Sequence, residues 1–515
     1  SYSGELAYLD IEERLHRKIL SESGFDEIIT TQHVRQKNWS HRFHYGLDYF
    51  LNEKNQFNLY GFYNPYSWEH DGNVTLTTTG GETSDQFAHK EDNDLNHSAF
   101  YSVYYKHIFN ENNGHEISAD AGLYTLKAEN ETVFSNAETG YFQMNSTKPR
   151  QINASLKLDH KIGLSKKIKL NSGFQTRKQA LKDALNDEFK WTEETLAAYT
   201  EFQYSNEKLD LLTGLRIEKS AMKPNNQETK NYGTLLPALN LNFKLANSQN
   251  IRFSYRKSLS RPAFHQINPF ILKEDPFSIQ TGNPNLLPEY RQNINIEYSR
   301  RFDKSFMAGS VFYTKTSDAI NTLTQINHEG IFETNTYNLG ALHRYGLQFT
   351  GAFSIGKSFS FNPYLRLFEV YALPNDKGLE GGLIKNHKQG IESGFSTIFN
   401  LRSNITASVL FQYNTPVQKM QRTYYSGALY FISLDKRFGR SFKAGIISGV
   451  PFSKTFVYNG YKIENEDFST HSEGTVQMST IPVWFKFTYQ FSSGKSRAKI
   501  ERATETFEKS PKKGF

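Results

Sequence analysis

The chain contains no cysteine among its 515 residues, which excludes a disulfide framework and a thiolate metal site. It also lacks any uninterrupted apolar run of about 18 residues, the length a transmembrane helix needs. Only 37% of its residues are hydrophobic. Mean hydropathy is −0.63, a value typical of soluble proteins. No composition break or Pro/Gly/Ser-rich linker divides residues 1–491, so we expect one domain there.

Signs of catalysis are also missing. No nucleophile elbow, His-Glu-x-x-His pair or phosphate-binding loop occurs, so neither an enzyme nor a cofactor is expected. The net charge of +7 lies partly in the C-terminal tail and does not indicate nucleic-acid binding. Residues 80–97 are predicted to form a loop, and its acidic and histidine side chains follow no known metal-ligand spacing. We therefore expect a solvated loop there and no metal site, with metal binding as the alternative; the side chains are Glu82, Asp85, His89, Glu91, Asp92, Asp94 and His97.

What the chain does contain is alternation with a period of two. In residues 43–51 the odd positions are apolar or aromatic, whereas His44, Gly46 and Asp48 fill most of the even ones. This period places alternate side chains on opposite faces of a β-strand. The same pattern occurs in residues 117–123, 154–158, 209–217 and 294–298. One face of each strand is therefore apolar and the other polar.

Turns and aromatic residues distinguish a membrane barrel from a soluble sandwich. Short polar turns are predicted at residues 52–55, 111–114, 164–167, 206–207, 246–249, 303–304, 356–357, 402–403 and 439–440. Longer connections lie between them, an asymmetry typical of outer-membrane barrels. Aromatic residues make up 15% of the chain, with 41 Phe, 30 Tyr and 4 Trp, and many are near strand ends. We predict an all-β transmembrane antiparallel up-and-down β-barrel in the outer membrane of a Gram-negative bacterium, in contact with outer-membrane lipid.

The barrel is expected over residues 1–491, with about 20 strands visible and 22 in the complete protein. The last strand, residues 483–491, carries Phe485, Phe487, Tyr489 and Phe491 on one face, a pattern that barrel-assembly machinery is expected to recognise. Residues 492–515 are rich in Lys, Arg, Glu and Ser. We interpret them as a basic, disordered periplasmic tail, or alternatively as a docking segment for a periplasmic partner.

Two further groups of residues are candidates for function. The proline-rich connection 258–288 is predicted to be a stiff loop rather than a ladder strand. It either binds a ligand or folds inward to brace the barrel mouth; the candidate ligand-binding residues are Arg261, Phe264, His265, Phe270 and Phe277. Charged residues on the lumen side either guide a substrate or form a polar wall; they are Asp48, Asp120, Asp210, Arg216, Glu218 and Glu297.

One part of the sequence is more specific than the general pattern of a β-barrel. Residues 256–270 read Arg-Lys-Ser-Leu-Ser-Arg-Pro-Ala-Phe-His-Gln-Ile-Asn-Pro-Phe, and residues 281–290 read Thr-Gly-Asn-Pro-Asn-Leu-Leu-Pro-Glu-Tyr. Together with residues 46–55, 275–277, 338–340 and 345–347, they resemble motifs of TonB-dependent receptor barrels, especially the outer-membrane β-barrel family common in Bacteroidetes-type bacteria. The resemblance implies energised uptake of a ligand bound by extracellular loops, with an inner-membrane TonB complex acting on a plug.

The chain departs from that pattern at its N-terminus, where neither a plug nor a TonB box is found. We expect it to be the barrel portion of a longer receptor that contacts the TonB energy complex through a plug outside this chain. Two alternatives stay open. One is a barrel scaffold in an export or assembly complex, and the other is a passive pore.

Overall fold

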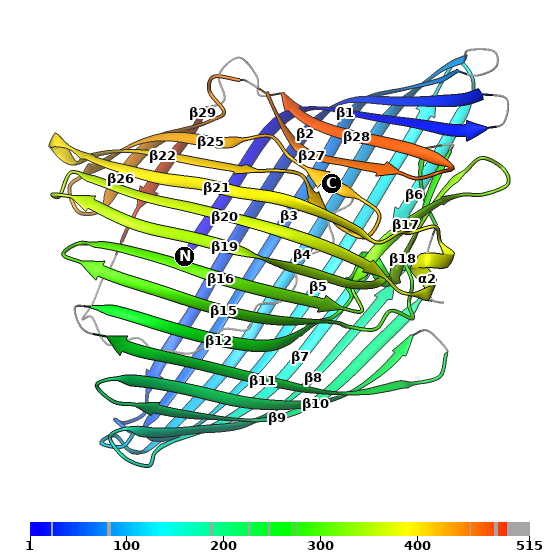
Figure 1. Ribbon diagram of the computed structural model, residues 1–515. Coiled ribbons are helices and arrows are strands. Elements are labelled where there is room, and N and C mark those ends of the chain that lie inside the picture. The colour runs from blue at the N-terminus through cyan, green and yellow to red at the C-terminus, as the bar shows by residue number, and fades with distance from the viewer. Residues whose placement is uncertain are drawn as a thin grey trace.

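The protein is a single large β-barrel, as the computed structural model in Figure 1 shows. The structure describes residues 1–21, 24–79, 84–185, 189–224, 227–245, 248–269, 271–275, 277–453, 455–477 and 483–491. A 25-stranded antiparallel sheet forms the wall, and a 4-stranded sheet lies apart from it. The predicted fold class is therefore confirmed. The tail predicted at residues 492–515 lies outside the described residues.

The first half of the wall contains β1 (Tyr2–Ser21), β2 (Gly24–Phe50), β3 (Asn55–Thr79), β4 (Ser84–Asn110), β5 (His115–Asn136), β6 (Tyr141–Thr147), β7 (Pro149–Gly163), β8 (Ile168–Asp183), β9 (Lys190–Ser205), β10 (Leu209–Pro224), β11 (Lys230–Leu245) and β12 (Gln249–Ser260). The second half contains β15 (Glu289–Phe302), β16 (Ser305–Ser317), β19 (Gly340–Ile355), β20 (Phe359–Pro374), β21 (Asn386–Leu401), β22 (Ile405–Asn414), β23 (Val417–Gln418), β24 (Thr423–Tyr425), β25 (Leu429–Phe438), β26 (Phe442–Gly449), β27 (Thr455–Glu464), β28 (Phe468–Gln477) and β29 (Val483–Tyr489).

Two pairs of these segments each form a single crossing of the wall. β27 continues β26, β29 continues β28, and the short β6, β23 and β24 lie outside the regular sequence of hairpins. The remainder gives about twenty crossings, as expected. β1 pairs with β28 from Asp10 to Ile19, whereas β29 pairs with β26, so the wall closes through the upper part of the C-terminal hairpin. Among the described residues, no helix has both the length and the apolar character that crossing a membrane requires.

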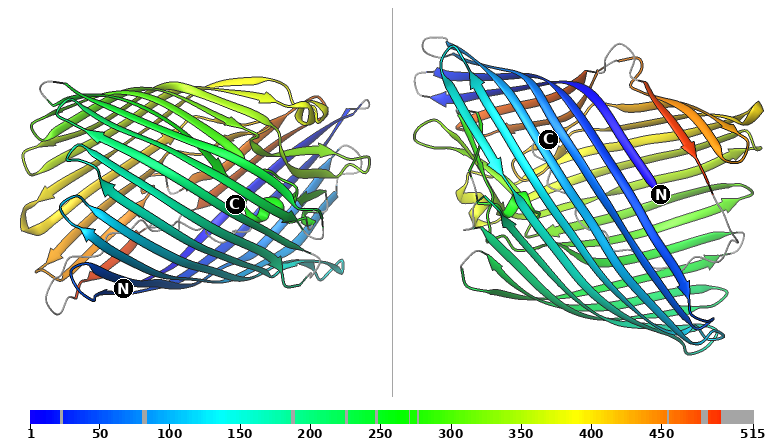
Figure 2. Two further views of the ribbon diagram at one scale, coloured as in Figure 1. Left: turned by 90° about the horizontal axis from the view of Figure 1, so that it is seen from below. Right: turned by 180° about the vertical axis from the view of Figure 1, so that it is seen from behind.

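The short turns lie at the positions predicted from the sequence. Each predicted turn within the described residues joins two paired strands at the left end of the barrel in Figure 1, for example between β2 and β3 or between β19 and β20. The turn predicted at residues 246–249 lies partly outside the described residues. The longer connections and α2 (Asp376–Glu380) lie at the opposite end. In an outer-membrane barrel the short turns are periplasmic and the long connections extracellular. This assigns the end near α2 as the outer mouth, and the views in Figure 2 show the strands inclined between the two ends.

The predicted alternation is also confirmed. On β2, the odd-numbered side chains Phe43, Tyr45, Leu47 and Tyr49 are all exposed, because they point outward toward lipid. The same holds for Leu215 and Ile217 on β10 and for Leu365 and Leu367 on β20. An apolar band on the outside and a polar lumen explain how a chain of low hydropathy can span a membrane.

One expectation about a loop is wrong. Residues 84–97 are not loop but the upper part of β4, which pairs with β3 along its length and with β5 from His89. The period-two pattern is obscured there because strand faces above the membrane are polar on both sides. His70 on β3 contacts Asp92 on β4 at 3.0 Å, so a side chain predicted to be solvated lies against its neighbouring strand.

Candidate functional site at the outer mouth

A second sheet lies at the outer mouth of the barrel. It contains β13 (Leu272–Asp275), β14 (Ser278–Thr281), β18 (Phe332–Asn338) and β17 (Ile320–Ile326), in that order. β13 and β14 come from the connection 261–288, and β17 and β18 from the connection between β16 and β19. The first connection was predicted to contain no ladder strand, which is wrong for these two short strands. β13 pairs with β14, and β14 pairs with β18, away from the wall. Two separate connections are therefore joined into one mouth sheet.

Apolar contacts fasten the mouth sheet to different parts of the wall. Phe277, Ile326 and Phe332 pack with residues of β2, β3, β27 and β28. Ala319, Leu323 and Leu339 pack with Ala372 of β20. Ile267 of helix α1 (Phe264–Ile267) and Leu286 are fully buried among side chains of β8, β9 and β10. Because these three clusters lie on different arcs of the barrel, the connections reach across its mouth.

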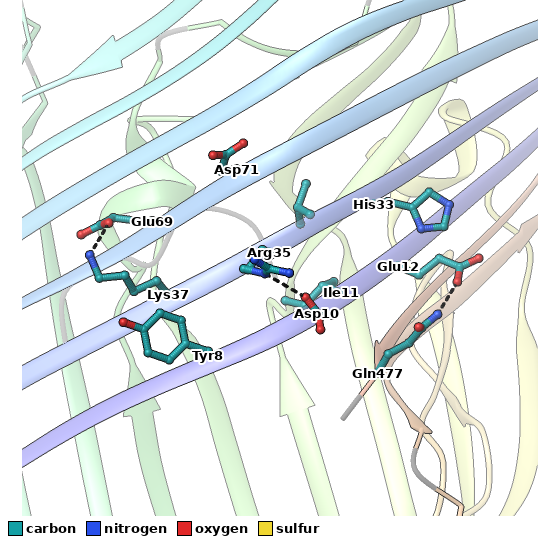
Figure 3. Close-up of a pocket in the computed structure, with 11 residues that line it drawn as sticks. Tyr8, Asp10, Ile11, Glu12, His33, Arg35, Lys37, Glu69, Asp71 and Gln477 are labelled. Carbon is teal, nitrogen blue, oxygen red and sulfur yellow. Dashed lines mark hydrogen bonds and ion pairs between the residues drawn. The ribbon is translucent and has the colours of Figure 1, made fainter. Parts of the chain in front are cut away.

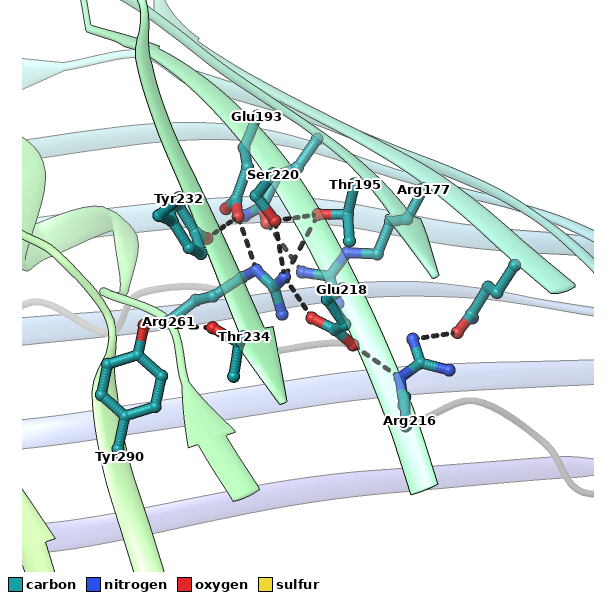
Figure 4. Close-up of polar contacts among 12 residues, drawn as sticks. Arg177, Glu193, Thr195, Arg216, Glu218, Ser220, Tyr232, Thr234, Arg261 and Tyr290 are labelled. Carbon is teal, nitrogen blue, oxygen red and sulfur yellow. Dashed lines mark hydrogen bonds and ion pairs between the residues drawn. The ribbon is translucent and has the colours of Figure 1, made fainter. Parts of the chain in front are cut away.

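An arginine whose side chain is 14% exposed holds the base of the first connection. Arg261 follows the end of β12, and its guanidinium donates to Glu193 of β9 at 2.7 Å and to Glu218 of β10 at 2.9 Å (Figure 4). Thr195 and Ser220 accept further hydrogen bonds from it. Burial alone would lower the pKa of Arg261, but the nearby carboxylates outweigh that effect and raise it. A permanently charged side chain thus fixes the connection to two wall strands.

A second arginine, more deeply buried, belongs to the wall and binds the mouth sheet. Arg17 of β1, only 2% exposed, donates to Asp275 of β13 at 2.6 Å and to Thr30 of β2 at 3.1 Å. Its guanidinium also lies 5.1 Å from the ring centroid of Phe332 on β18, a cation–π contact. Charge pairs as deeply buried as this one are strongly destabilised when one partner is removed.

The motif residues that carried the family resemblance interlock at this site. The Asn338 side chain accepts a hydrogen bond from the Leu287 amide at 3.0 Å and donates to the Leu287 carbonyl at 2.9 Å. Gly282 lies so close to the backbone that a Cβ would come within 2.4 Å of the Asn268 carbonyl oxygen. Gly340 has a φ of 126°, and a Cβ there would come within 2.2 Å of the Leu373 carbonyl oxygen. These motifs are therefore needed for the folding of the mouth.

The predicted ligand-binding residues lie in different environments. Arg261 is paired with carboxylates of the wall strands, and Phe277 packs in the hydrophobic cluster that contains Phe332. His265, on α1, is exposed. The Phe264 side chain and residue Phe270 lie outside the described part of the chain. The structure thus shows the bracing role that was the alternative, and ligand binding by these residues stays a prediction.

The lumen wall is polar, and its charges are largely paired. Arg366 of β20 donates to Glu392 of β21 at 2.9 Å and to Gln348 of β19 at 2.6 Å, and Arg344 donates to the same Glu392. The predicted lumen residues Asp210 and Arg216 pair with Lys244 and Glu218. Asp120 accepts a hydrogen bond from Ser102, Asp48 accepts one from Asn58, and Glu297 lies 4.0 Å from Arg252. Among the described residues, no group of three or more acidic or histidine side chains converges as a metal site.

The four aromatic residues predicted as an assembly signal lie on β29 and just beyond it. Phe485, Phe487, Tyr489 and Phe491 are between 70% and 78% exposed. They form an apolar stripe at the periplasmic end of the last strand. Recognition by assembly machinery stays a prediction.

The fold is that of a large outer-membrane β-barrel (Figure 1). Similar solved structures include the copper transporter OprC (TM-score 0.55, 11% identity, covering 92% of this chain and 80% of that one). The FrpB iron transporter from Neisseria meningitidis aligns with a TM-score of 0.53 and 9% identity, covering 91% and 82% of the two chains. A mutant ferric enterobactin receptor, PfeA, from Pseudomonas aeruginosa aligns with a TM-score of 0.52 and 11% identity, covering 91% and 81%.

A model of the outer membrane protein beta-barrel family matches residues 90–489, and the chain belongs to this family. It is located in the outer membrane of a Gram-negative bacterium. A search of curated proteins gave no match.

Proposed function

We propose that the protein is the barrel of a TonB-dependent receptor, which takes up a solute captured at the outer mouth. In this proposal a plug occupies the polar lumen, and an inner-membrane TonB complex supplies the energy that displaces it. The architecture shared with named outer-membrane transporters supports the proposal. So do the paired polar side chains of the lumen, which suit contact with a folded plug better than with lipid.

The mouth sheet is the observation that carries this proposal. Its strands are held by the buried pairs of Arg261 and Arg17 and by three apolar clusters. Connections that reach across the opening from several sides would obstruct diffusion through a passive pore. In a receptor, the same connections restrict entry to a solute that first binds at the mouth.

Conductance of the intact native protein tests the proposal. Protein extracted from outer membranes and placed in planar bilayers is expected to show no steady current, because plug and mouth sheet obstruct the lumen. A large steady conductance would instead establish a passive pore. In the same preparation, photocrosslinking to the TonB protein is expected, whereas stoichiometric co-purification of export or assembly proteins would favour a scaffold.

The intact mass of the native protein identifies the source of the plug. A mass well above the 59.4 kDa of the present chain is expected if the plug is part of the same polypeptide. A mass near 59.4 kDa together with a closed conductance state would require a separate plug subunit.

A further inference from the structure

A depression of about 390 Å³ lies on the wall where β8, β9 and β10 meet. Thr176 and Lys178 of β8, Glu194 and Leu196 of β9, and Lys219 of β10 line it, with Asn231 of β11 at one side. Strand pairing places Lys219 beside Leu196 and Lys178 beside Glu194. These side chains therefore occupy neighbouring positions on one face of the wall.

That face points outward. Thr195 and Ser220 point into the barrel, where both accept hydrogen bonds from Arg261 (Figure 4). Since successive side chains of a strand alternate, their neighbours Glu194, Leu196 and Lys219 point away from the lumen.

The depression lies at the upper edge of the lipid-facing surface. Leu215 and Ile217, which precede Lys219 on the same face of β10, are 39% and 55% exposed, and Leu196 is 53% exposed. Lys219 stands ten residues above the start of β10 at Leu209, on a strand that begins at a periplasmic turn. Inclined strand residues in this number cross an apolar band of about 25 Å. Lys219 thus lies at the level of the outer-leaflet headgroups.

Positive charge exceeds negative charge around this depression. Lys178 pairs with Glu194 at 2.6 Å, but Lys219 has no ion pair among the described residues. Above them, Lys182 of β8 stands directly opposite Lys190 of β9, and Lys223 is exposed on β10. These lysines add positive charge to the outward surface above the depression.

A second depression on the outward face of β1, β2 and β3 provides the contrast (Figure 3). There Arg35 pairs with Asp10 at 3.3 Å, and Lys37 pairs with Glu69 at 2.9 Å. Glu12 and Asp71 add further negative charge. Carboxylates therefore outnumber cations on that surface, whereas cations outnumber carboxylates around the depression at β8–β10, which is the one suited to an external anion.

We propose that the depression at β8–β10 binds the phosphate group of a phosphorylated lipid in the outer leaflet. The ammonium groups of Lys178 and Lys219 face the phosphate, with the Thr176 hydroxyl and the Asn231 amide as neutral donors. The acyl chains of the same lipid lie along Leu196 and Ile217. Basic pockets beside an apolar membrane surface are the usual sites of lipid phosphate recognition. The proposal does not depend on the transport function.

The test compares two double variants purified from outer membranes in mild detergent. K178Q/K219Q removes both lysines of the depression. K166Q/K167Q removes two exposed lysines of a periplasmic turn and changes the net charge equally. Native mass spectrometry counts the phosphorylated lipid that each protein retains, and heat-dependent gel mobility confirms that each barrel is folded.

The wild type and K166Q/K167Q are expected to retain one phosphorylated lipid. K178Q/K219Q is expected to bind it about 25-fold more weakly, roughly fivefold for each lysine, and K178R/K219R to restore retention. Equal retention by the K178Q/K219Q variant would overturn the proposal. So would displacement of the lipid by inorganic phosphate alone, because the site would then be one for a free anion.

Discussion

Replacement of Arg261 by Ala should detach the first connection from the wall. The variant leaves Glu193 and Glu218, which are 3% and 6% exposed, without their shared cation. Removing one partner from a buried ion pair costs about 3–5 kcal/mol. The strands of the wall do not depend on Arg261, so we expect this cost to appear as local opening of the connection and not as loss of the barrel. At about 1.4 kcal/mol per factor of ten, the open fraction should rise by at least about 100-fold.

Amide hydrogen exchange measures this opening directly. The amides of Gly282 and Asn283 donate to the carbonyls of Asn268 and Gln266 within the connection, so they report its integrity. In R261A their protection should fall by about the factor given above, while amides of β9 and β10 keep theirs.

A double variant separates loss of the contact from the burial of unpaired charge. In R261M/E193Q the residue at position 193 is neutral and Glu218 keeps its ion pair with Arg216, so much of the protection should return. Unchanged protection in R261A, or equal exchange in both variants, would refute the role assigned to Arg261.

Three other outcomes follow from the same structure. D275N should loosen the mouth sheet from β1, because Arg17 loses its charged partner, and fluorescence quenching of a label placed on β18 should report the release. G340A should abolish formation of the heat-resistant folded band on gels, whereas G356A, in an open hairpin turn with φ 61° and no atom near its Cβ position, should fold at a cost of about 1 kcal/mol. Lysine in place of Leu47 on the lipid face should lower the free energy of unfolding in urea by about 2–4 kcal/mol; no change would place Leu47 outside the membrane band.

The wall could be predicted from the sequence because its determinants are local. Each strand shows its own period of two, and each periplasmic turn is a short polar interruption between two such patterns. The pattern fails where its physical cause ends. Above the membrane there is no lipid to select apolar side chains, so the upper part of β4 reads as a polar loop although it is paired on both edges.

The mouth could not be predicted, because its contacts join residues far apart in the chain. Arg17 and Asp275 are 258 positions apart, and neither shows any local sign that it is buried. Arg261 stood out as an arginine beside a proline in a stiff loop, a pattern that suits ligand binding and bracing equally. What separates the two is the position of Glu193 and Glu218 on neighbouring strands, which only the register of β9 with β10 establishes.

The same stretch of wall serves the two sides of the barrel by different chemistry. On β9 and β10, Thr195 and Ser220 join the anchor of the mouth sheet inside, while Leu196 and Lys219 face lipid outside. Because neighbouring residues of one strand share a backbone, a lipid held at Lys219 would also restrict the strands that hold Arg261. If the lipid phosphate site exists, K178Q/K219Q should therefore increase exchange at the Gly282 amide as well. If K178Q/K219Q loses the lipid but leaves exchange at the Gly282 amide unchanged, lipid binding outside the wall does not affect the anchor of the mouth sheet inside it.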